Sequence, residues 1–403
     1  TKYKSGDYLP YIYKTENYGK TWRQITNGIG AEDFTRALRA DPKRKGLLYA
    51  GTERGMYISF DDGSNWNKFQ LNLPIVPITD LAIKNDNLIA ATQGRSFWMI
   101  DDLTPMHQLT TSLVQEDVIL FKPQDSYRMG GGNGRTSKTE GTNHPGGVAI
   151  NYFIKEKDAK EPVSLQIYDS NDALIKTFST NPNKEKKEAK LTLENGNNIF
   201  YWDMMYPGAE KVKGMILWWA SLNGPMALPG NYKVTLTMGE TSKSQNFTIL
   251  KNPISETTLA DATAQFDFIN DINTKVTEIH KALKNVKKVR AQVTALQTSI
   301  KNKEKHSELL DYAASLLKEM TIIEETLYQT KSKSGQDPLN FPIRLNNKLA
   351  HLNSLTRIGS YAPTQQAIDF KNEINKEIDK ELSKLYDLFN NKVTVLNKKV
   401  KDS

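Results

Sequence analysis

The stretch SFDDGSNW at positions 59–66 decides the fold, because an earlier near-copy, TENYGKTW, stands at positions 15–22. Both copies follow the pattern Ser/Thr-x-Asp/Asn-x-Gly-x-x-Trp, and their tryptophans are 44 positions apart. An Asp or Asn side chain can bond the backbone of its own turn, and glycine supplies the positive φ of a tight hairpin. A repeat of this length with a hairpin turn in each copy is typical of β-propeller blades.

Composition limits the kind of protein that the chain can be. Its 403 residues are too many for one core and indicate about two to four domains. The net charge of +8 comes from 54 basic and 46 acidic residues, and without a nucleic-acid motif it indicates a solvated lysine-rich surface. The absence of cysteine excludes disulfides, thiolate chemistry and cysteine-ligated zinc. We expect no cofactor, no metal, no nucleic acid and no membrane span.

Residues 1–118 are expected to form terminal propeller blades. A hairpin pattern at 47–52 and 55–59 is repeated about 40 positions later, at 88–92 and 97–101, without the Asp-Gly turn. Two blades and the opening of a third cannot close a propeller, for which about four blades are the minimum. We therefore expect the remaining blades to come from the same longer protein or from another chain.

Several motifs in this region resemble a known family. The strings DFTRALRADP (33–42), LYAGTERG (48–55) and DDGSNW (61–66) are similar to sortilin-type and BNR (Asp-box) propellers. The string TQGRSFWMIDDL (92–103) resembles, more narrowly, large secreted bacterial proteins common in Bacteroidetes, as does DPLNFPIRLNNKL (337–349). The resemblance implies a secreted, periplasmic or cell-surface location, with a signal peptide upstream of this chain.

In that family the Asp-box turns lie at the rim of the blades, away from the central channel where sialidases hold their catalytic groups. The resemblance thus implies that the turn residues have structural roles. These residues are Thr15, Asn17, Gly19, Trp22, Ser59, Asp61, Gly63 and Trp66.

Charged residues near the ends of the expected strands are the candidates for a functional site. Glycoside hydrolysis needs paired carboxylates, and Glu53 with Asp101 or Asp102 could supply them. We favour salt bridges or turn caps for these groups, since acid–base work requires perturbed pKa values. No residue is assigned as catalytic, and the candidate binding residues are Arg39, Glu53, Arg54, Arg95, Trp98 and Asp101.

Residues 119–252 are expected to form an immunoglobulin-like β-sandwich, similar to flagellar-hook-cap or fibronectin-type modules. Six strand-like segments follow one another at short spacing, and most of them alternate apolar and polar residues, with turns such as DSND at 169–172. The glycine-rich stretch 129–147 is expected to be a surface loop, because no Gly-Lys-Ser/Thr follows it. The aromatic residues Trp202, Tyr206, Trp218 and Trp219 are expected to pack in the core and between domains.

Residues 253–403 are expected to form a four-helix bundle. Apolar residues recur every seven positions from Ile272 to Ile300, and three further amphipathic segments follow with short connections.

The function that we expect is that of a non-catalytic protein- or peptide-binding or scaffold region in a secreted or cell-surface multidomain propeller protein. One alternative is a sialidase- or xyloglucanase-like glycoside hydrolase whose catalytic carboxylates lie in upstream blades, which would make a glycan the ligand. Another is an accessory component or cargo of a bacterial surface secretion machinery.

Overall fold

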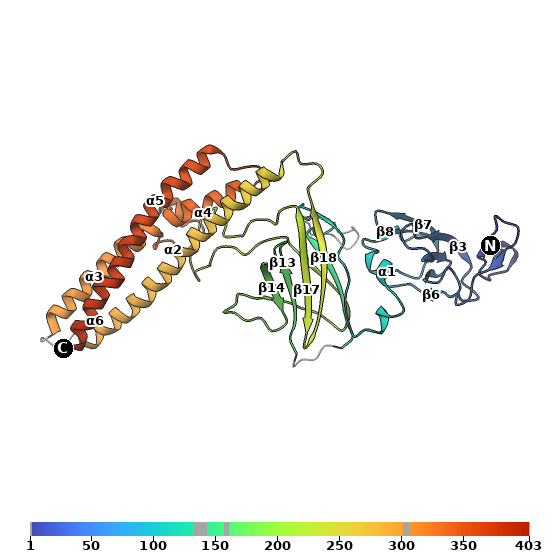
Figure 1. Cartoon of the computed structure of the whole chain (residues 1–403), viewed down its shortest axis with the longest axis horizontal. Coiled ribbons are helices and arrows are strands. Elements are labelled where there is room, and N and C mark those ends of the chain that lie inside the picture. The colour runs from blue at the N-terminus through green and yellow to red at the C-terminus, as the bar shows by residue number, and fades with distance from the viewer. Residues whose placement is uncertain (1, 133–142, 157–160, 301–305, 403) are drawn as a thin grey trace.

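The computed structural model describes residues 2–132, 143–156, 161–300 and 306–402. The chain is a series of β-sheets followed by a helical region, with the N-terminal sheets at one end and the helices at the other (Figure 1). A β-rich region of several sheets followed by helices confirms the coarse architecture expected from the sequence.

Three antiparallel sheets follow one another in the N-terminal region. We call them the first, second and third blade sheets; a short helix, η1 (Tyr3–Ser5), precedes them. Their strands are β1 (Tyr13–Lys14) and β2 (Arg23–Gln24) in the first; β3 (Thr35–Ala40), β4 (Leu48–Thr52), β5 (Gly55–Ser59) and β6 (Asn67–Lys68) in the second; and β7 (Ile78–Lys84), β8 (Asn87–Thr92) and β9 (Phe97–Ile100) in the third.

Strand pairing repeats from sheet to sheet. Tyr13 pairs with Gln24 in the first sheet, and Tyr57 pairs with Lys68 in the second, at the 44-residue spacing of the turn motif. The second and third sheets each carry a bulge near the start of their first strand, after Thr35 and after Ile78. The three sheets are therefore copies of one unit, of which the first has two strands here, the second four and the third three.

Apolar side chains pack between successive blade sheets. The cluster between the second and third sheets includes the fully buried Tyr49, Ile78 and Leu81. A smaller cluster joins the first sheet to the second and includes Ile25 and Trp66. Since both clusters combine residues of neighbouring sheets, each blade sheet depends on its neighbour for stability.

Two sheets that share one core form the middle of the chain. Helix α1 (Thr104–Gln108) and η2 (Leu113–Gln115) lead into them. One sheet has the strand order β10 (Val118–Leu120), β12 (Val148–Ile154), β16 (Gly196–Trp202); the other has β11 (Ser126–Tyr127), β18 (Thr241–Leu250), β17 (Gly230–Met238), β13 (Val163–Tyr168), β14 (Leu174–Ser179), β15 (Ala189–Lys190).

Strand β10 at the start of this region pairs with β12 and so belongs to the first of these sheets. The core between the two sheets includes Ile150 and Trp202 from one and Leu165 and Val234 from the other, all fully buried. Residues 133–142 of the predicted loop at 129–147 lie outside the described residues.

The C-terminal region is helical and has one continuous core. Its members include Ile272, Leu316, Leu349 and Ile378, one from each of four helices. The elements are α2 (Leu259–Ile300), α3 (Ser307–Leu327), η4 (Asp337–Leu339), α4 (Leu345–Thr356), α5 (Gln365–Asp387), the π-helical turn η5 (Leu388–Val393) and α6 (Thr394–Lys401).

Candidate functional site

The turn before Trp66 is held by bonds from side chains to backbone. Ser59 Oγ accepts a hydrogen bond of 3.0 Å from the N–H of Gly63, and Asp61 Oδ1 accepts one of 2.8 Å from the N–H of Asn65. Gly63 has a φ of 83°, the left-handed conformation that favours glycine. The residue types of the motif thus match the bonds that the turn requires.

The earlier copy of the turn has the same bonds. Thr15 Oγ1 accepts from the N–H of Gly19 at 2.8 Å, and Asn17 Oδ1 accepts from the N–H of Thr21 at 2.9 Å. Gly19 has a φ of 86°. In these bonds, an amide side chain replaces the carboxylate of the later copy without changing the geometry.

The two tryptophans of the motif lie in different surroundings. Trp66 is only 3% exposed and donates its indole N–H to the carbonyl of Ile25, which directly follows β2 of the first blade sheet. Trp22 is 60% exposed and donates to Gly19 of its own turn. One motif therefore produces a buried contact between sheets in one copy and an exposed aromatic surface in the other.

Three of the candidate binding residues are held in ion pairs on the second blade sheet. The closest partners are Asp80 for Arg39 (2.6 Å), Arg36 for Glu53 (2.5 Å) and Asp33 for Arg54 (2.8 Å). Burial acts to raise the pKa of Asp33, but the bonds from Tyr57 and Arg54 outweigh it, so that this pKa is lowered. These contacts hold the strand ends together, as the salt-bridge interpretation expects.

The other three candidates lie along strand β9. Arg95 is in the turn before the strand, Asp101 directly follows it, and both are exposed. Trp98 is half-buried between them and donates its indole N–H to the carbonyl of Arg95 at 2.9 Å. Within the described part of the chain, neither Arg95 nor Asp101 has a salt bridge.

The geometry keeps Glu53 and Asp101 apart. Gly51, near the end of β4, lies against Ile78 of the third blade sheet. A Cβ atom added to Gly51 would be only 2.7 Å from the Ile78 side chain. Ile78 pairs with Thr92 at one end of β8, whereas Ile100 pairs with Leu88 at the other. These ends are about 13 Å apart at a rise of about 3.3 Å per residue. Glycosidase carboxylates lie about 5–10 Å apart, so this backbone spacing favours separate roles for Glu53 and Asp101.

Strand β9 has an open edge that exposes apolar side chains. No described strand pairs with it on the side away from β8. Phe97 is 76% exposed and Met99 is 54% exposed. The corresponding side chains of β5 in the second sheet, Met56 and Ile58, are 4% and 3% exposed. This surface is the clearest departure from the repeat in the described region.

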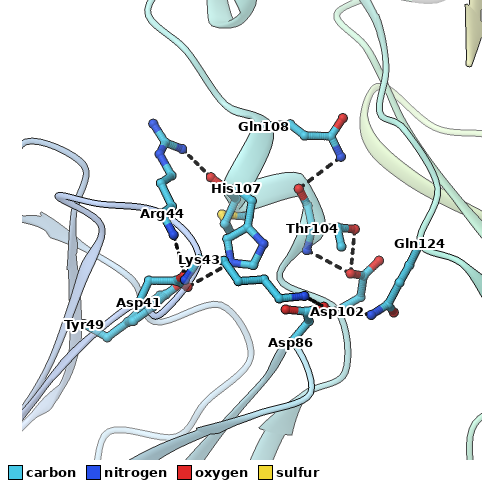
Figure 2. Close-up of polar contacts among 11 residues, drawn as sticks. Asp41, Lys43, Arg44, Tyr49, Asp86, Asp102, Thr104, His107, Gln108 and Gln124 are labelled. Carbon is cyan, nitrogen blue, oxygen red and sulfur yellow. Dashed lines mark hydrogen bonds and ion pairs between the residues drawn. The ribbon is translucent and has the colours of Figure 1, made fainter.

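A polar junction joins the blade sheets to the middle region, and Figure 2 shows its residues. The buried carboxylate of Asp41 contacts His107 Nε2 of α1 at 2.9 Å and accepts from the backbone N–H of Lys43 at 2.8 Å. Arg44 donates to the carbonyl of Met106 in the same helix. These contacts join the β3–β4 connection to α1.

Two further carboxylates extend the junction (Figure 2). Asp86 accepts from Lys43 Nζ at 2.6 Å and from Gln124 Nε2 at 3.0 Å. Asp102 accepts from Thr104 Oγ1 at 2.6 Å and from Asn151 Nδ2, in β12, at 3.1 Å. Every carboxylate of the junction is bonded to protein groups, which favours a structural role over catalysis.

Of this junction, the sequence singled out only Asp102, as a possible carboxylate partner of Glu53. Asp41 and His107 are 66 positions apart and belong to no shared motif. The one signal was the Asp-Pro pair at 41–42, since Asp often accepts bonds from the backbone of a turn that it begins.

The aromatic residues of the middle region have several environments. Trp202 is fully buried in the core, and the rings of Tyr206 and Phe266 of α2 contact edge to face at 4.8 Å between centroids. Trp219 is 74% exposed. Trp202 and Tyr206 therefore pack as expected, in the core and against the helices, whereas Trp219 does not.

A cleft of about 1100 Å³ lies where the middle region meets the helices. Its lining includes the exposed Lys186, Lys187 and Lys211, with Asp203 as the acidic residue. Arg357 also lines it, but bonds Ser221 Oγ at 2.7 Å and the Gly224 carbonyl at 2.9 Å. The cleft is thus an open basic surface rather than a site with converging buried groups.

The described residues contain no group of three or more His, Asp or Glu side chains placed to hold a metal ion. No described helix is long and apolar enough to cross a membrane.

Comparisons with known proteins add little at the level of sequence. No protein-family model matches the chain, and no curated protein matches it. Solved structures include the extracellular domain of the one-component system BT4673 from B. thetaiotaomicron, with 10% identity over 60% of this chain, a TM-score of 0.20 and 28% of that chain covered. The same domain, described as part of a hybrid two-component system, has 8% identity, a TM-score of 0.20 and the same share of this chain, with 29% of that chain covered. YCF48 bound to D1 peptide has 12% identity over 58% of this chain, a TM-score of 0.19 and 60% of that chain covered. The chain thus spans less than a third of the length of the first two.

Proposed function

We propose that this chain is a non-catalytic protein- or peptide-binding region of a secreted or cell-surface multidomain protein. The observation that carries the proposal is the exposure of Phe97 and Met99, at positions whose counterparts Met56 and Ile58 are buried. Exposed apolar groups that lie next to one another mark interaction surfaces more often than scattered single residues do.

The charged residues around this surface support binding over catalysis. Arg39, Glu53 and Arg54 are engaged in ion pairs, and Glu53 is far from Asp101. Arg95 and Asp101 keep their charges exposed at the two ends of β9. Such charges can orient a partner and select it, even though each contributes little affinity.

Finer aspects of the architecture belong to the same proposal. We infer that the blade sheets are terminal blades of a sortilin-like Asp-box propeller at 1–118, that 119–252 is an immunoglobulin-like sandwich and that 253–403 is a four-helix bundle. The repeated pairing register and turn bonds support the first inference. Further blades of a longer protein would then be partners of this chain, since three sheets do not close a ring.

A selection with random peptides displayed on phage tests the binding function. We expect the full chain to enrich a defined set of peptides and the double variant Phe97→Ser/Met99→Ser to lose that enrichment. The matched control is Ile322→Ser on α3, which removes an apolar side chain that is 58% exposed elsewhere. Equal enrichment by the double variant would place binding away from this surface and refute the proposal.

The alternative of a glycoside hydrolase has its own test. Polysaccharides would be incubated with the chain and with the Glu53→Gln and Asp101→Asn variants. We expect no release of reducing sugar. Turnover that either variant abolishes would overturn the non-catalytic proposal.

A further inference from the structure

We propose that the open edge of β9 takes up an extended peptide as an additional antiparallel strand, with an acidic group toward the peptide's C-terminal end. This inference rests on the proposed function and deepens it by naming the binding mode and the class of ligand. Addition of a strand to an exposed sheet edge is a general mode of peptide recognition, in which main-chain bonds give affinity and side-chain pockets give specificity.

The first step of the argument is the direction of the backbone groups in β9. The N–H of Thr92 donates to the carbonyl of Ser96 at 3.2 Å, so these two residues form a hydrogen-bonded pair. Bonded and non-bonded pairs alternate along an antiparallel ladder. Trp98 therefore bonds to β8, whereas the N–H and C=O groups of Phe97 and Met99 point away from β8 toward the open edge.

The second blade sheet shows what such an edge binds. The N–H of Phe69, which directly follows β6, donates to the carbonyl of Met56 at 2.8 Å, so the alternate residues Met56 and Ile58 direct their backbone groups toward β6. Met56 corresponds to Phe97 because they pair with Gly51 and Ala91 at matching positions of β4 and β8.

The turns before β5 and β9 confirm this correspondence. Thr52 Oγ1 donates to the carbonyl of Gly55 at 2.9 Å, and Thr92 Oγ1 donates to that of Ser96 at 2.6 Å. The backbone N–H of Arg54 and of Arg95 donates back to the respective hydroxyl. The open edge of β9 thus offers the groups that an antiparallel strand already uses one sheet earlier.

The third step is the charge at the two ends of the edge. Arg95 precedes the strand and Asp101 follows it, and neither has a salt bridge among the described residues. An antiparallel ligand would bring its C-terminal end to Arg95 and its N-terminal end to Asp101. Charge complementarity therefore selects an acidic group near the C-terminal end of the peptide and a basic group near its N-terminal end.

The fourth step is the space beside Trp98. A cleft of about 40 Å³ is lined by apolar side chains that include Leu71, Leu88, Trp98 and Ile100. Residues directly opposite each other in an antiparallel pair have their side chains on the same face. The ligand residue opposite Trp98 would point toward this cleft, whose volume exceeds the ~10–15 Å³ that one water molecule needs. A small apolar side chain such as alanine fits there.

The test uses the synthetic peptide Arg-Thr-Val-Ala-Val-Thr-Glu, with both ends blocked, which extends from Asp101 to Arg95 in this register. We expect saturable binding to the full chain by isothermal titration calorimetry. Methylation of the two valine nitrogens should weaken binding by about tenfold or more, because these N–H groups would donate to Phe97 and Met99. Methylation of the alanine nitrogen, which would point away from β9, is the matched control.

Variants of the protein supply a second measurement. Met99→Pro removes an N–H that faces the open edge, where proline is tolerated in strands, and should abolish binding of the peptide. Arg95→Glu should weaken binding, and a peptide with Lys in place of its Glu should restore it.

Two outcomes would overturn the inference. One is an equal effect of valine and alanine methylation on the unaltered protein. The other is binding that Met99→Pro leaves unchanged. The phage selection could require Phe97 and Met99 while peptides methylated at valine and at alanine bind with equal affinity. In that case the proposed function stands and strand addition fails. If Phe97→Ser/Met99→Ser keeps the binding of displayed peptides and Met99→Pro keeps the binding of the synthetic peptide, both the proposed function and strand addition are refuted.

Discussion

The indole Nε1 of Trp66 donates a hydrogen bond of 2.8 Å to the carbonyl oxygen of Ile25, 41 residues earlier in the chain. The backbone N–H of Trp66 also donates to the carbonyl of Asn27, at 2.9 Å. The second repeat is thereby attached to the first through one residue of the turn motif. Trp22, at the same motif position, contributes no comparable attachment, since its indole bonds its own turn.

Replacement of the two tryptophans should have unequal effects. We expect Trp66→Ala to lower the free energy of unfolding of the blade sheets by about 3–5 kcal/mol, because it empties a buried site between two sheets. Trp22→Ala should cost about 0.5 kcal/mol or less, as is usual for exposed side chains. Amide hydrogen exchange in residues 12–103 measures both effects apart from the helical region. Equal losses would show that burial of Trp66 does not stabilise the contact between the sheets.

Acid should weaken the junction around Asp41. Burial acts to raise the pKa of Asp41, but the bonds from His107 and from the N–H groups of Lys43 and Arg44 outweigh it, so that its pKa lies below the ordinary 3.8. A lowered carboxyl pKa adds stability above the unfolded pKa and loses it as the pH falls through the folded pKa. We therefore expect unfolding of this region to become easier below about pH 4.

The Asp41→Asn variant tests this assignment. It should be less stable at neutral pH and should lose stability less steeply in acid, as measured by urea unfolding at a series of pH values. Asp267→Asn, at an exposed position of α2, is the control and should keep the steep acid dependence. An unchanged slope for Asp41→Asn would assign the acid dependence to other carboxylates.

Much of the local structure followed from the sequence because it depends on neighbouring residues. The turn bonds of Ser59 and Asp61 join positions four apart, so residue types alone could predict them. The helices from Leu259 onward followed from the spacing of their apolar residues. In both cases the pattern and the contacts lie within one element.

Contacts between distant elements could not be predicted in this way. The different burial of Trp22 and Trp66 depends on whether another sheet lies against each one. The pairing of Asp41 with His107 depends on how α1 returns to the second blade sheet. The open edge of β9 follows from the absence of a fourth strand in the third sheet among the described residues. The sequence showed only that Arg95, Trp98 and Asp101 are close together along the chain.

The buried His280 of α2 should make the helical region sensitive to mild acid. Its Nδ1 contacts the carbonyl of Glu210 at 2.5 Å, and its Nε2 contacts the amide of Asn346 at 3.3 Å. Burial lowers its pKa from 6.5, and the nearby Lys284 acts in the same direction, while Glu210 opposes it. The unfolded chain therefore takes up a proton at a higher pH than the folded one, and stability falls as the pH drops below about 6.5.

We expect His280→Gln to remove this dependence between about pH 7 and pH 5, with a loss of about 1–3 kcal/mol at neutral pH from the altered buried contacts. Thermal unfolding followed by circular dichroism at 222 nm, the helix signal, would record the effect. His144→Gln, at an exposed position outside the helices, should keep the dependence of the wild type. If both variants behave alike, His280 is not the group responsible.

Arg128 should hold the middle region against the helices. It is 7% exposed, donates its Nε–H to the carbonyl of Ala227 at 2.8 Å and donates a second hydrogen bond to Ser360 Oγ, between α4 and α5. Burial lowers its pKa, and no carboxylate within the described ranges forms an ion pair with it. The guanidinium is therefore stabilised by these neutral acceptors, which lie on both sides of the contact.

Replacement of Arg128 should loosen this contact without unfolding either part. We expect Arg128→Met to cost about 2–3 kcal/mol and to expose the connection 251–258 to proteolysis. Arg128→Lys should rescue little, because an ammonium group cannot reproduce the fixed directions of the guanidinium donors. Lys190→Met, at an exposed position of β15, is the control and should leave cleavage unchanged. Cleavage of Arg128→Met at the wild-type rate would mean that other contacts between the two regions, such as Tyr206 with Phe266, suffice to hold them together.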